Sequence, residues 1–356
     1  AWQILKEEQQ MRKSIRNGLI ASLAGASMVL LSACSGGSGD TAKDEGAEEK
    51  GEEVTEEAGD CPTDLSDITV GFVAVGPEGG WRDANENNVQ QAFKDAGAEV
   101  KYAGTADNDQ ANQLQAFSSF VDEGVDVILL SATEATGWET ALGDAKAADI
   151  PVVLIDRMID PDEPDLYVQR LAPNNEEVAA NAAKWANEEF PEGANYVVLE
   201  GPAGVSVVNE RNNGWDENID ANFTKLEAQT ANWSAAEGKT VFSSMLKSHN
   251  NDIQLVFAQN DEMGLGAIQA VEEAGLKPGE DVKIITIDGT KPALEALAEG
   301  KLNLVAEYNP MFGADAVQTV IDTLCGKTVE KNYIVQSALF DSPEAAKAAL
   351  DAGRDF

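Results

Sequence analysis

Strand and helix patterns alternate regularly from Asp67 to Ile287, and this alternation restricts the possible folds more than any other feature of the chain. Short apolar runs of strand length, such as 68–75, 125–130 and 255–258, are each followed by a segment whose apolar residues recur at helical spacing. The series contains no run of consecutive hairpins. It therefore predicts an α/β fold with parallel sheets, in which right-handed crossovers place helices on both faces.

The number of repeated units exceeds what one open sheet usually holds. The chain has 356 residues, and 43% of them are hydrophobic, which is enough to build two cores. A second series of strand and helix patterns begins near Pro173. We therefore expect two similar doubly wound parallel-sheet lobes, although no close sequence repeat relates them.

The N-terminal part has the pattern of a bacterial export signal. Residues 1–10 precede a natural-looking start at Met11 and are interpreted as upstream translation or an artificial extension. A basic segment follows, and the apolar run Gly18–Leu31 is too short to span a bilayer comfortably. It ends in small residues before Cys34, as in the lipobox of lipoproteins. We expect residues 1–33 to be upstream residues plus signal peptide and Cys34 to be lipidated; an ordinary signal peptide with an incidental cysteine is the alternative.

The next segment, 34–64, consists mainly of Gly, Ser, Ala, Glu and Asp and is expected to be an acidic, disordered tether. The whole chain has 63 acidic and 25 basic residues, a formal net charge of -38. Such a charge repels phosphates, so a nucleic-acid partner is not expected. Cys61 and Cys325 could form a disulfide in an exported protein, but two separate thiols fit the sequence equally well.

Polar and aromatic side chains gather in the turns that follow the predicted strands. Ligands of open α/β folds bind outside the carboxyl ends of the strands, so these turns are expected to share one cleft. The candidate ligand-binding residues from these turns are Glu78, Trp81, Arg82, Trp138, Asp156, Arg157, Arg211, Trp233, Asn260 and Asp288.

This mixture of side chains suits a sugar. Hydroxyl groups both donate and accept, and planar carboxylate, carboxamide and guanidinium groups can bind a pair of them. Aromatic faces pack against the C–H face of the sugar ring. An apolar mimic of the sugar would leave a buried polar group of the site without a hydrogen-bond partner and would therefore bind less well. A phosphate site would instead need a glycine-rich cradle with a lysine, which none of these turns has.

Several candidates also have a structural explanation. Asp156 and Arg157 could form a surface ion pair of little energetic value. Trp215 is flanked by helical pattern and is expected to lie in the core. At the turn after the strand pattern 255–258, we expect Asn260 to face sugar hydroxyls and Asp261 to cap the following helix.

The sequence gives little support to catalysis. It has one histidine, no zinc-ligand spacing and no nucleophile elbow, so no catalytic residue, metal or cofactor is expected. Glycoside hydrolysis needs only two carboxylates, so a glycoside-processing enzyme remains the alternative hypothesis. A repressor core would need a DNA-binding helix-turn-helix in front, where this chain has an export signal.

The folded part resembles the type I periplasmic sugar-binding proteins of ribose and galactose type, which are the solute receptors of ABC importers. It is most similar to the galactofuranose-binding and bifidobacterial fructose-binding members. The segments that carry the resemblance are 75–82, 135–139, 155–160, 260–269, 273–279 and 287–289.

The resemblance implies a role for each residue that matches a family motif. The family's ligand-binding positions fall on Asp156, Arg157, Arg211, Trp233, Asn260 and Asp288, with Asn175 and Glu307 as two further matches. Glu78, Trp81 and Arg82 match the galactofuranose-type subgroup. Ribose binders carry a pair of phenylalanines at this place, so ribose itself is not the expected ligand.

The resemblance also implies three crossings between the lobes, near Pro173, Asn309 and Gln336, which together form a three-segment hinge. The expected N-terminal lobe comprises 65–173 and 309–336, and the expected C-terminal lobe comprises 174–308 and 337–356. Sugar binding would close the cleft, and the closed receptor would dock on an ABC permease.

The expected protein is an exported monomer, anchored through Cys34 to the outer face of the cytoplasmic membrane, that captures a monosaccharide of galactofuranose or fructose type. A sugar-sensing receptor for chemotaxis or signalling on the same fold is the alternative function.

Overall fold

The computed structural model describes residues 62, 64–105, 109–160, 165–354 and 356. The predicted signal peptide, the lipidation site Cys34 and almost all of the tether lie outside the described residues. Cys325 is disulfide-bonded, whereas Cys61 lies outside the described residues, so a disulfide between these two cysteines stays one of the alternatives that the sequence leaves open. Among the helices of the described ranges, none has both the length and the apolar character that a membrane crossing requires.

In the described part of the chain, six strands form the sheet of the N-terminal lobe, in the order β11-β5-β4-β3-β1-β2 and with every pair parallel. The strands are β1 (Thr69–Ala74), β2 (Glu99–Gly104), β3 (Val127–Leu130), β4 (Val152–Ile155), β5 (Arg170–Ala172) and β11 (Asn332–Ile334). All residues of β3 and β4 are buried. Because helices cover both faces, these strands are continuous apolar runs in the sequence.

The sheet of the C-terminal lobe has the order β12-β10-β9-β8-β6-β7 within the described residues. Its strands are β6 (Asn195–Glu200), β7 (Thr224–Thr230), β8 (Leu255–Ala258), β9 (Lys283–Asp288), β10 (Leu304–Glu307) and β12 (Leu339–Phe340). The short edge strand β12 pairs antiparallel with β10, which differs from the purely parallel sheet expected from the sequence. The remaining pairs are parallel.

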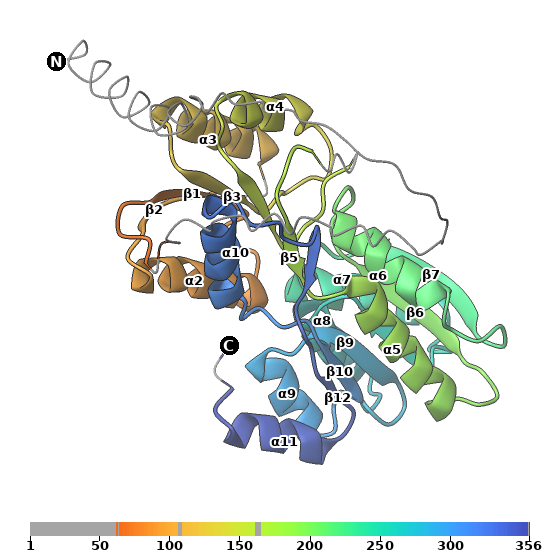
Figure 1. Cartoon of the computed structure of the whole chain (residues 1–356). Coiled ribbons are helices and arrows are strands. Elements are labelled where there is room, and N and C mark those ends of the chain that lie inside the picture. Colours follow the sequence, from red (N-terminus) through yellow and green to blue (C-terminus); the bar gives the residue numbers. More distant parts are fainter. Residues whose placement is uncertain (1–61, 63, 106–108, 161–164, 355) are drawn as a thin grey trace, which may run out of the picture. The chain divides into compact units, whose positions relative to one another are not determined.

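Helices cover both faces of the sheets. In the N-terminal lobe α3 and α4 lie together on one face, and α2 and α10 pack together on the other (Figure 1). The C-terminal lobe pairs α5 with α6, α7 with α8 and α9 with α11. The helices are α2 (Gly80–Asp95), α3 (Gln110–Glu123), α4 (Glu139–Ala147), α5 (Asn175–Glu189), α6 (Ser206–Asp216), α7 (Ala235–Ser248), α8 (Asp261–Glu273), α9 (Lys291–Ala298), α10 (Gly313–Leu324) and α11 (Pro343–Asp351).

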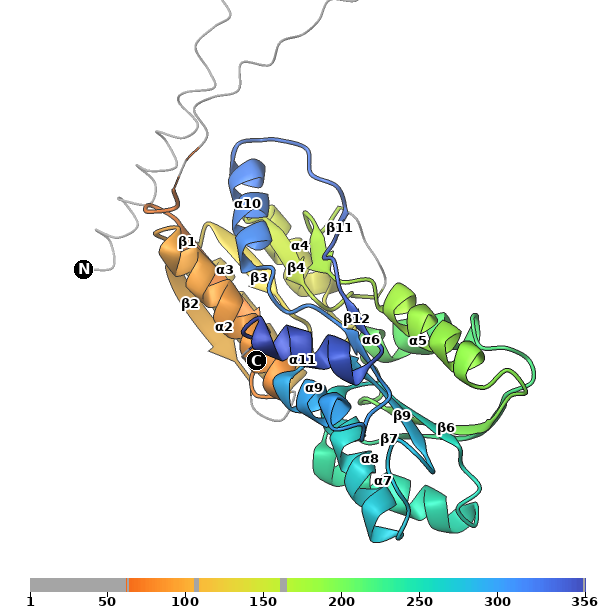
Figure 2. The same cartoon turned by 90° about the horizontal axis from the view of Figure 1, so that it is seen from below.

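The chain passes between the two sheets three times. It leaves the first sheet after β5 to form α5, returns after β10 to form α10, and leaves again between β11 and β12. Figure 2 shows α10 and β11 beside the N-terminal lobe, while β12 and α11 lie with the C-terminal lobe. The predicted fold class, two doubly wound α/β lobes joined by three segments, is therefore confirmed.

Two helix boundaries and the end of the series differ from the sequence prediction. The sequence pattern predicts a helix over 85–96, whereas α2 begins at Gly80, directly after Gly79, whose φ of 132° favours glycine. The pattern also predicts a helix from about Val208 to Phe223, whereas α6 ends at Asp216. The predicted series ends at Ile287, whereas β10, α9, α10 and α11 follow in the structure.

Candidate functional site

A cavity of about 40 Å³ lies between the carboxyl ends of the two sheets, where open α/β folds bind their ligands. Nine of the twelve predicted ligand-binding residues line it. The lining comprises Glu78, Gly79, Trp81, Arg82, Asp156, Arg157, Val207, Arg211, Trp233, Asn260, Glu262, Asp288 and Tyr308. The sequence prediction therefore located the cavity, while a role in binding remains to be argued for each residue.

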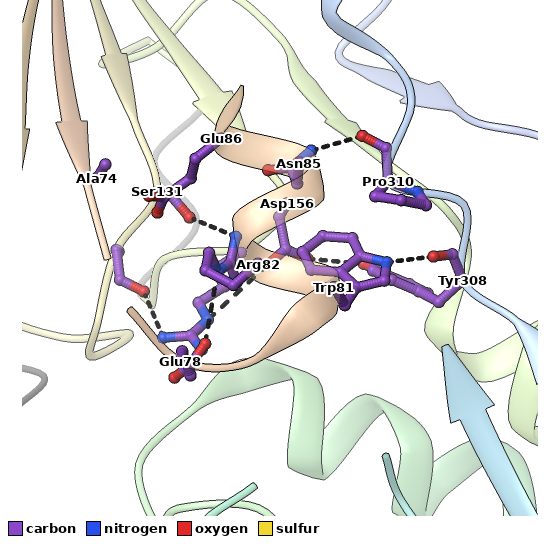
Figure 3. Close-up of polar contacts among 12 residues, drawn as sticks. Ala74, Glu78, Trp81, Arg82, Asn85, Glu86, Ser131, Asp156, Tyr308 and Pro310 are labelled. Atoms are coloured by element: carbon purple, nitrogen blue, oxygen red, sulfur yellow. Dashed lines mark hydrogen bonds and ion pairs between the residues drawn. The ribbon is translucent and has the colours of Figure 1, made fainter. Parts of the chain in front are cut away.

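The first turn of α2 supplies part of the N-terminal wall. Arg82 is buried, and its Nη2 donates to Asp156 Oδ2 at 2.5 Å, while its Nε lies 3.4 Å from Glu78 Oε2 (Figure 3). A further contact joins Nη1 to Ser131 Oγ at 3.4 Å. Burial lowers the pKa of Arg82, but the carboxylates of Asp156 and Glu78 raise it more, so the guanidinium stays charged.

Asp156 and Arg157 complete this wall at the end of β4. Burial raises the pKa of Asp156, but Arg82 and Arg157 lower it more, and the net effect keeps the carboxylate ionised. Arg157 Nη2 donates to Glu78 Oε2 at 2.5 Å, and Nη1 lies 3.3 Å from the carbonyl oxygen of Ala132. The pair is buried, so the alternative of a surface ion pair is wrong.

Arg211 organises the C-terminal wall. Its Nε donates to Asn175 Oδ1 at 2.9 Å, and its Nη2 lies 3.4 Å from Asp288 Oδ1. The guanidinium carbon lies 5.6 Å from the ring centroid of Trp233. Burial raises the pKa of Asp288 well above its usual value, and the charge of Arg211 opposes that shift.

Tyr308 connects the two walls but is absent from the prediction. Its hydroxyl donates to Asp156 Oδ1 at 2.8 Å and accepts from Asn175 Nδ2 at 3.0 Å, and its carbonyl oxygen accepts from Trp81 Nε1 (Figure 3). The prediction names the neighbouring Glu307 instead. Successive residues of a strand point to opposite faces, so an error of one position selects the wrong side chain.

Glu262 is a second lining residue that the sequence prediction missed. Its Oε1 accepts from the backbone N of Gly80 at 2.9 Å, and its Oε2 accepts from Asn260 Nδ2 at 2.7 Å. It follows the Asn260-Asp261 pair directly in the sequence and was interpreted only as helix. Its place in the first turn of a helix that begins at the cleft is the signal that could have identified it.

The roles predicted at the turn before α8 need correction. Asn260, not Asp261, caps α8, because its Oδ1 accepts from Met263 N at 3.0 Å. Asp261 is fully buried and accepts from Gly289 N at 2.9 Å and from Thr290 N at 2.7 Å. It therefore fixes the loop that precedes α9 instead of its own helix.

Three predicted ligand-binding residues do not line the cavity. Trp138 is buried in the N-terminal core, and its Nε1 donates to Glu134 O at 2.8 Å. Asn175 accepts a hydrogen bond from Arg211 and donates one to Tyr308, and both of these partners line the cavity. Glu307 accepts from Ala338 N at 2.6 Å and pairs with Arg354. These side chains are engaged within the protein, so the predicted direct contacts with a ligand are not supported.

Other expectations concern packing and metal binding. Trp215 is buried and stacks on Phe257 with a centroid distance of 4.2 Å, which confirms its predicted core position. Within the described ranges, no group of three or more His, Cys, Asp or Glu side chains is arranged to hold a metal ion.

Residues 70–328 match the model of the periplasmic binding protein domain. The chain belongs to this family. It is 51% identical over 293 residues to the fructose import binding protein FruE of Bifidobacterium longum, covering 81% of this chain and 89% of that protein. It is 36% identical over 290 residues to the galactofuranose-binding protein YtfQ of Escherichia coli, covering 80% and 91%.

A solved structure from Mycobacterium smegmatis, in complex with β-D-fucofuranose, is also similar to this chain. The TM-score is 0.77 and the identity 37%, covering 80% of this chain and 94% of that one. The resemblance inferred from the sequence is confirmed by these relatives. The matched family and the two relatives FruE and YtfQ are named as binding proteins, in agreement with the expectation of a binding protein rather than an enzyme.

Proposed function

We propose that this periplasmic binding protein captures a monosaccharide of fructose or galactofuranose type, in its furanose ring form, and delivers it to an ABC importer permease. The cavity between the lobes is the binding site. The proposal draws on the chemistry of the lining and on the ligands of the relatives, which are fructose, galactofuranose and β-D-fucofuranose.

One observation carries the proposal. Two buried atoms that belong to cavity-lining residues, Glu78 Oε1 and Arg157 Nε, have no hydrogen-bond partner among the described residues. One is an acceptor and the other a donor, and leaving either unpaired costs about 1–3 kcal/mol. A sugar hydroxyl both donates and accepts, so neighbouring hydroxyls can satisfy both atoms.

The charges of the lining favour a neutral ligand. Each arginine of the cavity has a carboxylate partner: Arg82 with Asp156, Arg157 with Glu78, and Arg211 with Asp288. The pairs of Arg82 and Arg157 therefore leave no positive charge on the N-terminal wall for a phosphate or carboxylate group of a ligand. A neutral polyol meets both donors and acceptors without disturbing the pairs.

Trp81 and Trp233 border the cavity from opposite lobes. Trp233 has a φ of 58°, which is uncommon for a bulky residue and indicates that the surrounding structure fixes its position. We infer that these indoles pack on the C–H faces of the sugar. Replacing either indole by Leu would test this contact separately from the hydrogen bonds.

The lobes touch across the cavity, so the structure has a closed cleft. Met158 N donates to Ser206 Oγ at 3.1 Å, and Ala135 N donates to Gly204 O at 3.3 Å. A sugar therefore needs the lobes to separate before it enters. We propose the three connections between the sheets as the hinge, with the lobes bounded as expected from the sequence.

Anchoring and delivery are the outer parts of the proposal. We propose lipidation of Cys34, which lies outside the described residues, and a monomeric receptor that docks on a permease. Palmitate labelling in a bacterial host tests the anchor, with Cys34→Ser as the matched control. An unlabelled product released into the medium would contradict anchoring.

Calorimetric titration with fructose, galactose, arabinose and ribose tests the binding function. We expect a one-to-one heat signal with fructose or with galactose, weaker heat with ribose, and none with the open-chain polyol mannitol. An absence of heat with every monosaccharide would overturn the sugar proposal.

A further inference from the structure

The loop that presents Asp288 to the cavity has an unfavourable backbone conformation. Asp288 ends β9 with a φ of 137°, a region that residues with a side chain rarely adopt, and Gly289 follows with a φ of 88°. Such a conformation persists only where neighbouring groups fix it. The contacts around this pair therefore determine where the Asp288 carboxylate lies.

One side of the loop is fixed from within the lobe. Asp261 Oδ2 accepts from Gly289 N at 2.9 Å and from Thr290 N at 2.7 Å. The Asp288 carbonyl oxygen accepts from Tyr308 N at 3.0 Å. These bonds leave the carbonyl of Gly289 to be held from elsewhere.

The other side of the loop is fixed by the C-terminal tail. Arg354 Nη1 donates to Gly289 O at 2.9 Å, and its Nη2 pairs with Glu307 at the end of β10. The guanidinium carbon lies 5.2 Å from the ring centroid of Phe340 and 4.7 Å from that of Phe356. The Arg354 side chain is only 14% exposed, so its contacts are largely shielded from solvent.

The tail makes a second contact beside the same loop. The carbonyl oxygen of Phe356 accepts from Lys291 N, in the first turn of α9. Arg354 therefore bonds to the loop at Gly289, and Phe356 bonds to the chain two residues later, at Lys291. Arg354 and Phe356 lie far along the sequence from the cavity-lining residues, and they contact the segment that directly follows the lining residue Asp288.

We propose that Arg354 is a positioning residue for ligand binding, which holds the Asp288–Gly289 loop in the conformation that presents the Asp288 carboxylate to the cavity. This inference rests on the proposed sugar-binding function for its affinity readout. It gives the C-terminal tail a role in recognition, and it explains why Glu307, predicted to bind the ligand, instead anchors the arginine. Preorganisation of this kind raises affinity without a new contact to the ligand.

The test compares Arg354→Gln, Arg354→Lys and the control Lys347→Gln. Lys347 is exposed on α11 and has the same charge, so its replacement matches the loss of charge without touching the loop. The first readout is hydrogen exchange of the Gly289 and Thr290 amides in the ligand-free protein. We expect about tenfold faster exchange in Arg354→Gln and no change in the control.

The second readout is the Kd for the sugar that binds the wild type. Arg354→Gln should weaken binding about tenfold at a temperature well below its Tm, and Arg354→Lys, which keeps a charged donor group, should give a Kd between those of the wild type and Arg354→Gln. Unchanged exchange and unchanged Kd in Arg354→Gln would overturn the positioning role. If Arg354→Gln does not fold, Arg354→Lys decides by the same readouts. If the wild type binds no sugar, the function fails, but the exchange measurement still decides the role of Arg354.

Discussion

Glu262 Oε1 and the backbone N of Gly80 form a 2.9 Å hydrogen bond between the two lobes. Helix α2 begins after Gly79 and has no side-chain cap of its own, so the carboxylate from the C-terminal lobe caps it instead. Burial raises the pKa of Glu262, and the bond from Gly80 lowers it. The proposed opening of the cleft would separate Glu262 from Gly80. We therefore expect this bond to stabilise the closed state and not the open state.

Replacement of Glu262 by Ala should therefore weaken binding of every sugar by a similar factor. A hydrogen bond to a charged group is worth about 1.5–3 kcal/mol, so we expect a roughly tenfold or greater rise in Kd. Calorimetry with several sugars measures it. Glu273→Ala is the control, since Glu273 lies on the same helix but pairs with Lys239 at the surface. A loss confined to one sugar would show that Glu262 contacts a particular hydroxyl instead.

Exchange of Arg157 for Ala should abolish measurable binding, a loss of about a hundredfold or more in affinity, because it removes the donor that has no partner and the shorter of the two ion pairs of Glu78. Circular dichroism should show the fold retained. An unchanged Kd would mean that the Asp156-Arg157 pair has only a structural role.

Asp261→Asn should lower the free energy of unfolding by about 1–3 kcal/mol, because the carboxylate accepts with both oxygens, from Thr286 Oγ1 on one and from Gly289 N and Thr290 N on the other, whereas an amide has one acceptor oxygen. Denaturant unfolding measures the change. The exposed Asp281 accepts one backbone bond, from Lys277 N, so Asp281→Asn is the matched control and should cost less. Equal costs would contradict the assignment of Asp261 as a support of the loop.

Burial raises the pKa of Asp261 to about 7, although hydrogen bonds from Thr286 and Thr290 oppose the shift. Between its ordinary pKa and 7 the folded protein keeps a proton that the unfolded chain has lost. The contribution of Asp261 to stability is therefore full below about pH 4 and decreases as the pH rises to about 7. Thermal unfolding between pH 5 and 8 should show this slope, and Asp261→Asn should flatten it. An identical slope in both proteins would contradict the shift.

The sequence predicted the fold because both sheets are buried on two faces, which leaves strands such as β3 and β8 as continuous apolar runs. It also located the cavity, since Asp156 and Asp288 lie directly at strand ends. For Trp138 and Asn175, the residue type alone did not show that the side chain forms its hydrogen bonds within the protein and not with a ligand.

The remaining errors concern side-chain directions and hydrogen-bond partners, which the sequence pattern does not show. Tyr308 was missed because it lies just after the short strand β10, and the strand pattern does not show which residue at that end faces the cavity. The role of Asp261 depends on Gly289 and Thr290, which lie 28 and 29 residues further along the chain. Long-range partners of this kind become visible only in the folded structure.

The central claim is that a sugar satisfies the two unpaired atoms of the cavity. A crystal structure with the tightest-binding sugar of the calorimetric panel tests it most directly. We predict hydroxyl oxygens within hydrogen-bond distance of Glu78 Oε1 and Arg157 Nε, with the ring between Trp81 and Trp233. A sugar that binds elsewhere, or that leaves both atoms unpaired, would contradict the account.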